Sequence, residues 1–230
     1  MKLLALDTSS IACSVALQID DRVSEEHVVR ERAHTGILMP MLKRLLGAAD
    51  CRLAELDAIV LGNGPGSFIG MRIGASVAQG LAQGSNVPLV PVSSLAAVAM
   101  ECFELDASVN VLVAQDARMN EVYLEGYAAD ESGMPIPVSE LSLQPVAAIQ
   151  SLREAASGAW LAAGDGWYRY PQLAELNGHL ALTVSDIRYP RARCLLAPGE
   201  AALLAGGSVD PAALVPAYVR QTVARVPESA

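Results

Sequence analysis

A chain of 230 residues, of which 52% are hydrophobic and 18% charged, is long enough to bury one large core or two smaller ones. Its formal net charge of −9 and its lack of any lysine-rich or arginine-rich block argue against direct binding of nucleic acid. Because no apolar run reaches membrane-spanning length and Asp7 comes too early for a signal peptide, we expect a cytoplasmic protein without membrane contact.

The first half of the chain predicts a sheet flanked by helices. A short strand over residues 3–6 precedes a strand over 13–19, which alternates in polarity, and a strand over 22–30 returns beside it to form a hairpin. Residues 34–47 predict a helix that is apolar nearly all round and therefore buried on two sides, with Pro40 causing a late start or a kink. A strand over 58–61, a glycine-rich loop, a helix, a strand over 89–92 and a helix capped by Ser93 follow.

The second half repeats this order. Strands are expected over 109–114, 122–127, 140–143 and 160–163, a helix over 146–155, and a loop at Gly164 and Gly166 where the first half has its glycine-rich loop. A helix over 192–205 and an extended piece over 216–220 end the chain, and we expect disorder beyond Thr222. We divide the chain into residues 1–105 and 106–230, with the last residues either returning to the first half or disordered. Each half is then a mixed sheet with flanking helices, an α/β architecture.

The helix after the glycine-rich loop carries a ridge of small residues. Gly70, Gly74 and Ala78 recur every four residues, and Ile73 and Val77 form an apolar ridge beside them. Glycine inside a helix costs roughly 0.5 to 1 kcal/mol relative to alanine, so tight packing must offset it. Two alternatives stay open: the ridge packs on the chain's own sheet, or it docks another subunit.

Two aspartates are the candidates for chemistry. If both halves open with a strand that ends in aspartate, Asp7 and Asp116 would face each other across a cleft and suit a magnesium-nucleotide site. Aspartate after a strand is also a common turn residue, and Ala117 and Arg118 replace the glycines that would let backbone approach a phosphate. Nucleotide binding therefore stays open at this point.

The other candidate sites are weaker. His34 lacks a second ligand one helical turn on, where Leu38 stands, which favours a structural role for it. Four scattered cysteines without a CxxC pair predict neither a zinc site nor a disulfide scaffold. The glycine-rich loop fails the Walker A pattern because Met71 and Arg72 follow Gly70, although it could still bind an anion.

Seven short segments together resemble one known family. They are LALDTS at residues 4–9 with CSVAL at 13–17, His34 with Thr35, GPGSF at 64–68 with RIG at 72–74, and DARM at 116–119 with EVY at 121–123. These segments resemble the bacterial TsaB (YeaZ) proteins. The resemblance runs along nearly the whole chain and is weakest over residues 176–211.

The resemblance implies a two-domain actin-like fold, as in sugar kinases, Hsp70 and actin. It also implies a role in making N6-threonylcarbamoyladenosine (t6A) beside the anticodon of tRNAs that read codons beginning with A. In that family TsaB is the non-catalytic partner of its paralogue TsaD, and the ATPase TsaE joins them. TsaB-like proteins pair through two N-terminal helices with TsaD or, alone, with a second copy, and tRNA is reached only through the complex.

Transferred to this sequence, the resemblance assigns no catalytic and no metal-binding residue. It gives a partner interface at His34, Ile37, Leu38, Met41, Gly70, Arg72, Ile73, Gly74, Val77 and Ala78. It gives a vestigial nucleotide or phosphate site at Asp7, Thr8, Ser9, Gly64, Gly66, Asp116, Gly164 and Gly166. No cofactor is required of this chain, and weak binding of a nucleotide with magnesium is left open. The alternative is an active magnesium-nucleotide enzyme of the same fold, either kinase-like or acyl-transferring.

Overall fold

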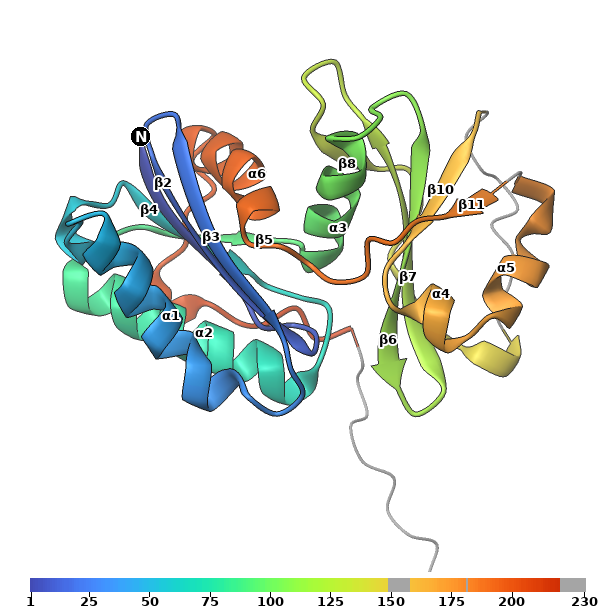
Figure 1. Cartoon of the computed structure of the whole chain (residues 1–230), viewed down its shortest axis with the longest axis horizontal. Coiled ribbons are helices and arrows are strands. Elements are labelled where there is room, and N and C mark those ends of the chain that lie inside the picture. The colour runs from blue at the N-terminus through green and yellow to red at the C-terminus, as the bar shows by residue number, and fades with distance from the viewer. Residues whose placement is uncertain (149–157, 181, 220–230) are drawn as a thin grey trace, which may run out of the picture.

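The computed structural model describes residues 1–148, 158–180 and 182–219. In these residues the chain forms two sheets side by side, each flanked by helices (Figure 1). The first sheet has the order β3-β2-β1-β4-β5, and the second has β11-β10-β6-β7-β8, with β9 also paired to β7. Each sheet therefore combines an antiparallel hairpin with parallel strands, and the predicted repetition of one architecture is confirmed.

The strands of the first sheet lie close to their predicted positions, but β2, whose alternation predicts a half-buried strand, is buried on both faces over Ala12–Leu17 because helices cover the sheet on both sides. The strands are β1 (Lys2–Asp7), β2 (Ala12–Ile19), β3 (Arg22–Val29), β4 (Ala58–Gly62) and β5 (Leu89–Val92). Strand β1 lies at the centre, antiparallel to β2 and parallel to β4. Because side chains alternate along a strand, Leu4 and Leu6 enter one core while Leu3 and Ala5 enter the core on the opposite face.

Two helices cover one face of this sheet. They are α1 (His34–Ala48) and α2 (Phe68–Ser85), which lie beside each other on the lower left of Figure 1. Helix α1 begins at His34 with Pro40 inside it, so the alternative of a late start is wrong. It is buried along one face only, since Met39 is 37% exposed and Lys43 is also exposed. The prediction that α1 is buried on two sides is therefore wrong for the isolated chain.

Helix α6 (Arg193–Leu204) covers the other face of the first sheet, although it follows the second sheet in the chain. Its Leu195 and Leu196 join the same core as Leu3 and Val60. The predicted division of the chain had placed this helix in the second half, because it lies after residue 105. Helix α3 (Ser94–Phe103), capped by Ser93 as predicted, lies between the two sheets and packs on β6, β7 and α6 (Figure 1).

The second sheet contains β6 (Asn110–Arg118), β7 (Glu121–Ala129), β8 (Pro135–Pro137), β9 (Ser142–Pro145), β10 (Trp160–Ala163) and β11 (Leu182–Val184). Short helices α4 (Gly166–Arg169) and α5 (Gln172–Leu176) pack on the face away from α3. Strand β6 continues beyond its predicted end, so Asp116 lies within a strand next to a register shift. Strand β8 was not predicted, and most of the helix expected over 146–155 lies outside the described residues.

The C-terminal segment returns to the first half of the molecule. The amide of Val209 donates to the carbonyl of Leu89 at 2.9 Å, and Gln79 Nε2 on α2 donates to the carbonyl of Pro211 at 2.8 Å. Further along, Arg72 Nε donates to the hydroxyl of Tyr218 at 3.0 Å. Residues up to Tyr218 therefore contact the first half of the molecule.

Candidate functional site

A hollow with a volume of about 720 Å³ lies between the two halves of the molecule. Its lining comes from the turn after β1, the start of α1, the start of α2, and the end of β6. The polar residues that line it include Ser9, Ser10, Arg32, His34, Ser67, Gln115, Asp116, Arg118 and Asp165. Position and polarity make this interlobe pocket the candidate site.

Asp7 does not reach this pocket. Its side chain is buried beneath the turn after β1, where Ser9 N and Ser9 Oγ each donate to Oδ1 at 2.8 Å. Ser94 Oγ donates to Oδ2 at 2.6 Å. Burial raises the pKa of the Asp7 carboxyl, against the lowering effect of the hydrogen bonds from Ser94 and Ser9. The prediction that Asp7 and Asp116 face each other across the cleft is therefore wrong, because the chain's own hydroxyl groups hold Asp7 inside.

Asp116 does line the pocket, but its carboxylate is already engaged. Tyr170 donates its hydroxyl to Oδ1 at 2.9 Å, and Oδ2 lies 3.4 Å from Arg169 Nε and 3.5 Å from Arg118 Nη1. A magnesium ion would have to displace these cations. In the described part of the chain, no group of three histidine, cysteine, aspartate or glutamate side chains is placed to hold a metal ion.

Two polar groups of the pocket were not singled out from the sequence. Asp165 accepts the amide N–H of Asp116 at 3.0 Å, and burial raises the pKa of its carboxyl to about 6. Gln115 is only 2% exposed, and its Oε1 has no hydrogen-bond donor. Both residues come just after predicted strands, so the sequence predicted turns at these positions. Their burial depends on contacts between strands and loops that are far apart in the chain.

The glycines of the first loop allow two backbone segments to approach closely. A Cβ on Gly66 would lie 2.2 Å from the carbonyl oxygen of Ser9, and a Cβ on Gly70 would lie 2.0 Å from that of Thr8. Thr8 itself is buried and donates Oγ1 to the Gly70 carbonyl at 2.7 Å. Gly64, at φ +87°, does not line the pocket. The start of α2 thus packs directly on the turn after β1.

The second loop behaves in the same way. A Cβ on Gly164 would lie 2.1 Å from the carbonyl oxygen of Ala114, and a Cβ on Gly166 would lie 2.8 Å from it. Gly164 also has a φ of +104°, which only glycine adopts readily. Neither glycine lines the pocket. Both are needed to pack the loop on β6.

His34 starts α1 and is only 8% exposed. Its Nε2 lies 3.2 Å from the carbonyl oxygen of Ala12, which fixes the ring between the helix and β2. Leu38, one turn on, is buried in the core. This geometry fits the structural role favoured from the sequence.

Comparisons with known proteins then identify the family. A family model described as "TsaD: tRNA N6-adenosine threonylcarbamoyltransferase" matches residues 28–162. The chain is 36% identical to the tRNA threonylcarbamoyladenosine biosynthesis protein TsaB of Haemophilus influenzae, over 97% of this chain and 95% of that protein. It is also 36% identical to the TsaB protein of Escherichia coli, over 97% of this chain and 96% of that protein.

The chain belongs to the TsaB (YeaZ) family. A solved structure of YeaZ from Pseudomonas aeruginosa superposes with a TM-score of 0.85 at 34% identity, covering 95% of this chain and 99% of that one. The expected actin-like fold of two related halves is thereby confirmed. None of the helices in the described residues is long and apolar enough to cross a membrane.

Most of the interface residues expected from TsaB-type pairing lie inside this chain. Leu38, Met41, Gly70, Gly74 and Ala78 are all buried among the chain's own elements, and a Cβ on Gly74 would lie 2.5 Å from the Thr8 Oγ1 atom. The interpretation of the small-residue ridge as an outward docking surface is wrong for this TsaB-family chain. The other alternative is correct: the small-residue ridge packs on the chain's own sheet, because α2 approaches β1 closely.

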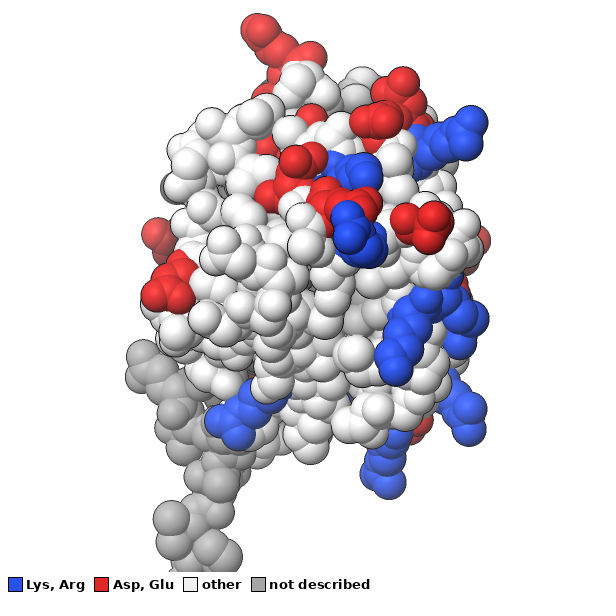
Figure 2. Space-filling model, turned by 90° about the vertical axis from the view of Figure 1, so that its left-hand side faces the viewer, with Lys and Arg blue, Asp and Glu red and all other residues white. Residues whose placement is uncertain are grey.

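Other residues of the same two helices remain accessible. Ile37 of α1 and Ile73, Val77 and Leu81 of α2 are half-buried, and Gly80 is exposed. We call these five residues the outer helical face. Figure 2 views the side of the molecule on which α1 and α2 lie, and a broad area without charged residues occupies its centre, with acidic residues above it and basic residues to the right and below. Arg72 is also exposed, but it packs over the Phe68 ring at 3.7 Å.

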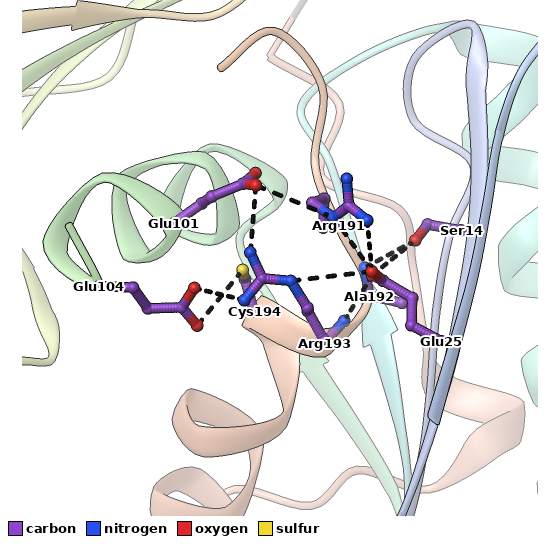
Figure 3. A network of polar contacts seen from close by, with 8 residues as sticks. All are labelled: Ser14, Glu25, Glu101, Glu104, Arg191, Ala192, Arg193 and Cys194. Carbon is purple, nitrogen blue, oxygen red and sulfur yellow. Dashed lines mark hydrogen bonds and ion pairs between the residues drawn. The ribbon is translucent and has the colours of Figure 1, made fainter. Parts of the chain in front are cut away.

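A polar network that the sequence did not predict joins the two halves. It lies where the chain crosses from the second sheet back to α6, and it consists of two arginines and three glutamates with neighbouring polar groups (Figure 3). Arg191 Nη2 lies 2.8 Å from Glu25 of β3, and Arg193 Nη2 lies 3.1 Å from Glu101 of α3. Arg193 also pairs with Glu104. The network fixes the start of α6 against both β3 and α3.

Proposed function

We propose that this TsaB-family chain is a non-catalytic subunit that supports a TsaD-type transferase, together with TsaE. The reaction attaches a threonylcarbamoyl group to N6 of the adenosine beside the anticodon in tRNAs that read codons beginning with A. The names of the relatives support the pathway, and the match to the TsaD family model supports a paralogous relation to the transferase.

The observation that carries the non-catalytic role is the condition of the two aspartates. Asp7 does not line the interlobe pocket, and its carboxylate accepts three hydrogen bonds. Asp116 is paired with Arg118 and Arg169. Neither carboxylate is free to hold magnesium beside a phosphate. Of the glycines that could admit a phosphate, Gly66, Gly164 and Gly166 are already packed against the chain's own carbonyl groups.

The outer helical face is the surface that we assign to the partner. Neither α1 nor α2 contains an aspartate or glutamate, although the whole chain has a net charge of −9. The half-buried apolar side chains of the outer helical face, together with the exposed Gly80, allow a second pair of helices to approach closely. Binding there would act by stabilising the competent state of TsaD through differential contacts. In the absence of TsaD, a second copy of this chain would occupy the same face.

The acidic charge of this chain supports contact with tRNA through the complex rather than directly. The test is a tRNA modification assay with purified TsaD and TsaE, unmodified tRNA and an activated threonylcarbamoyl donor, with and without this chain. We expect product only when all three proteins are present. Product from this chain alone, or full activity without it, would refute the proposed role.

The second candidate is a magnesium-nucleotide enzyme of the same fold. The exposed arginine Arg32 and the start of α2 at the interlobe pocket favour binding of an anion there. Calorimetric titration of the isolated chain with ATP, with and without magnesium, separates the two candidates. Tight, magnesium-dependent binding with turnover would support the enzyme, and weak or absent binding would support the partner subunit.

A further inference from the structure

A second hollow lies between the two halves, with a volume of about 480 Å³, and it is separate from the interlobe pocket. The first sheet and the helix α6 that covers it contribute residues after β4, at the end of β5 and on α6, while the second sheet contributes residues of β7 and β8. We call it the proline groove, because its walls include Pro65, Pro91, Pro135, Pro137 and Pro198. Proline has no backbone N–H, so these walls offer few hydrogen-bond donors.

A buried carboxyl group lines the proline groove. Glu125 of β7 is only 8% exposed, and it accepts a hydrogen bond from the hydroxyl group of Tyr127. No lysine, arginine or histidine in the described residues forms an ion pair with it. Burial raises the pKa of this carboxyl, against the lowering effect of the Tyr127 hydrogen bond. A buried carboxylate without a cation is costly, so this position calls for a functional explanation.

A second acceptor lines the same groove. Asn63 follows β4, and its Nδ2 donates to the carbonyl oxygen of Val215 at 3.2 Å. This bond orients the amide, and the other end, Oδ1, is buried without any donor. Buried polar atoms are normally paired, so an unpaired acceptor points to a missing donor. Glu125 and Asn63 come from different halves, so each side of the groove carries a hydrogen-bond acceptor.

We propose that the proline groove binds a small organic cation, namely a primary ammonium or guanidinium group on a short apolar stem. The cation supplies the donors that Glu125 and Asn63 lack, and the stem lies between the proline walls. Such a ligand would also bridge the two halves, because the groove is built from both. The site is independent of the outer helical face and of the role in the transferase complex.

The test uses the full chain and three probes of similar shape: n-butylammonium, n-butylguanidinium and neutral n-butanol. The amide resonances of Gly64, which lines the groove, and of Gly126, which lies between the lining residues Glu125 and Tyr127, are followed by NMR during each titration. We expect saturable shifts with the two cations and none with butanol. Equal shifts with butanol, or none with any probe, would overturn the proposal.

Two variants make the test specific to the carboxylate. Glu125→Gln keeps the shape and removes the charge, and we expect the cations to bind about tenfold more weakly or worse. Glu140→Gln removes an exposed carboxylate from the same half and should leave binding unchanged. The titration of Glu125 in the unmodified chain, followed by carboxyl carbon NMR, should move to lower pH when a cation is bound. Unchanged affinity in the Glu125 variant, or an unmoved titration, would contradict the assignment.

Discussion

Replacement of single glycines in α2 tests the internal packing of the small-residue ridge. A Cβ on Gly70 would lie 2.0 Å from the backbone carbonyl oxygen of Thr8, so either the helix or the turn after β1 must move. Overpacking of this kind costs about 3 kcal/mol at the upper end of its usual range. For a chain of this length we expect Gly70→Ala to lower the melting temperature by roughly 6 to 12 °C.

Gly80 provides the matched control on the same helix. A Cβ there would meet nothing within 4 Å, and the residue is exposed. Alanine is favoured over glycine inside a helix by roughly 0.5 to 1 kcal/mol, so Gly80→Ala should raise the melting temperature by about 1 to 4 °C. Differential scanning calorimetry on both variants gives the comparison.

The two variants should therefore change stability in opposite directions. If Gly70→Ala were as stable as the unmodified chain, the ridge would not be sealed by Thr8. The small residues would then have to be considered again as an open surface for a partner. Loss of stability in Gly80→Ala would show that the exposed side of α2 is packed in some other way.

Two further predictions concern charged groups. Asp165 has a pKa of about 6 instead of 3.8 because it is buried, so the folded chain binds more protons between these values and stability falls as pH rises from about 4 to 6. Asp165→Asn should remove about 3 kcal/mol of this pH dependence in urea unfolding, whereas Asp21→Asn, at an exposed position, should leave it unchanged. Arg193→Ala should destabilise the chain by about 2 kcal/mol, since Glu104 loses its cation and the partly buried Glu101 keeps only the longer contact with Arg191, at 3.8 Å. Arg52→Ala, in an exposed pair, should cost at most about 1 kcal/mol in the same experiment, and equal losses would refute the importance of the network.

The sequence predicted local elements well where periodicity and caps are strong. The alternation over 13–19 gave β2, and Ser93 marked the start of α3 through its side-chain cap. Strand β8 was missed because Pro135 and Pro137 argue against a strand, although prolines are tolerated at the edge of a sheet. The family assignment depended on several short motifs together.

The candidate site was harder to predict, because its decisive contacts join residues far apart in the chain. Ser94, 87 positions after Asp7, donates the hydrogen bond that helps to hold that carboxylate inside. Thr8 and Gly70 are separated by 62 positions, and their contact determines that the small-residue ridge faces inward. Helical spacing shows which residues share a face, but it does not show which face the sheet covers.

The measurement that tests the central claim most directly is the affinity of this chain for TsaD after a change on the outer helical face. Gly80→Arg adds a long charged side chain at an exposed position with open space around it, and Gly178→Arg makes the same change on the second half. By surface plasmon resonance, with circular dichroism to verify folding, we expect only the Gly80 variant to lose binding to TsaD. Full binding by a folded Gly80→Arg chain would contradict the account.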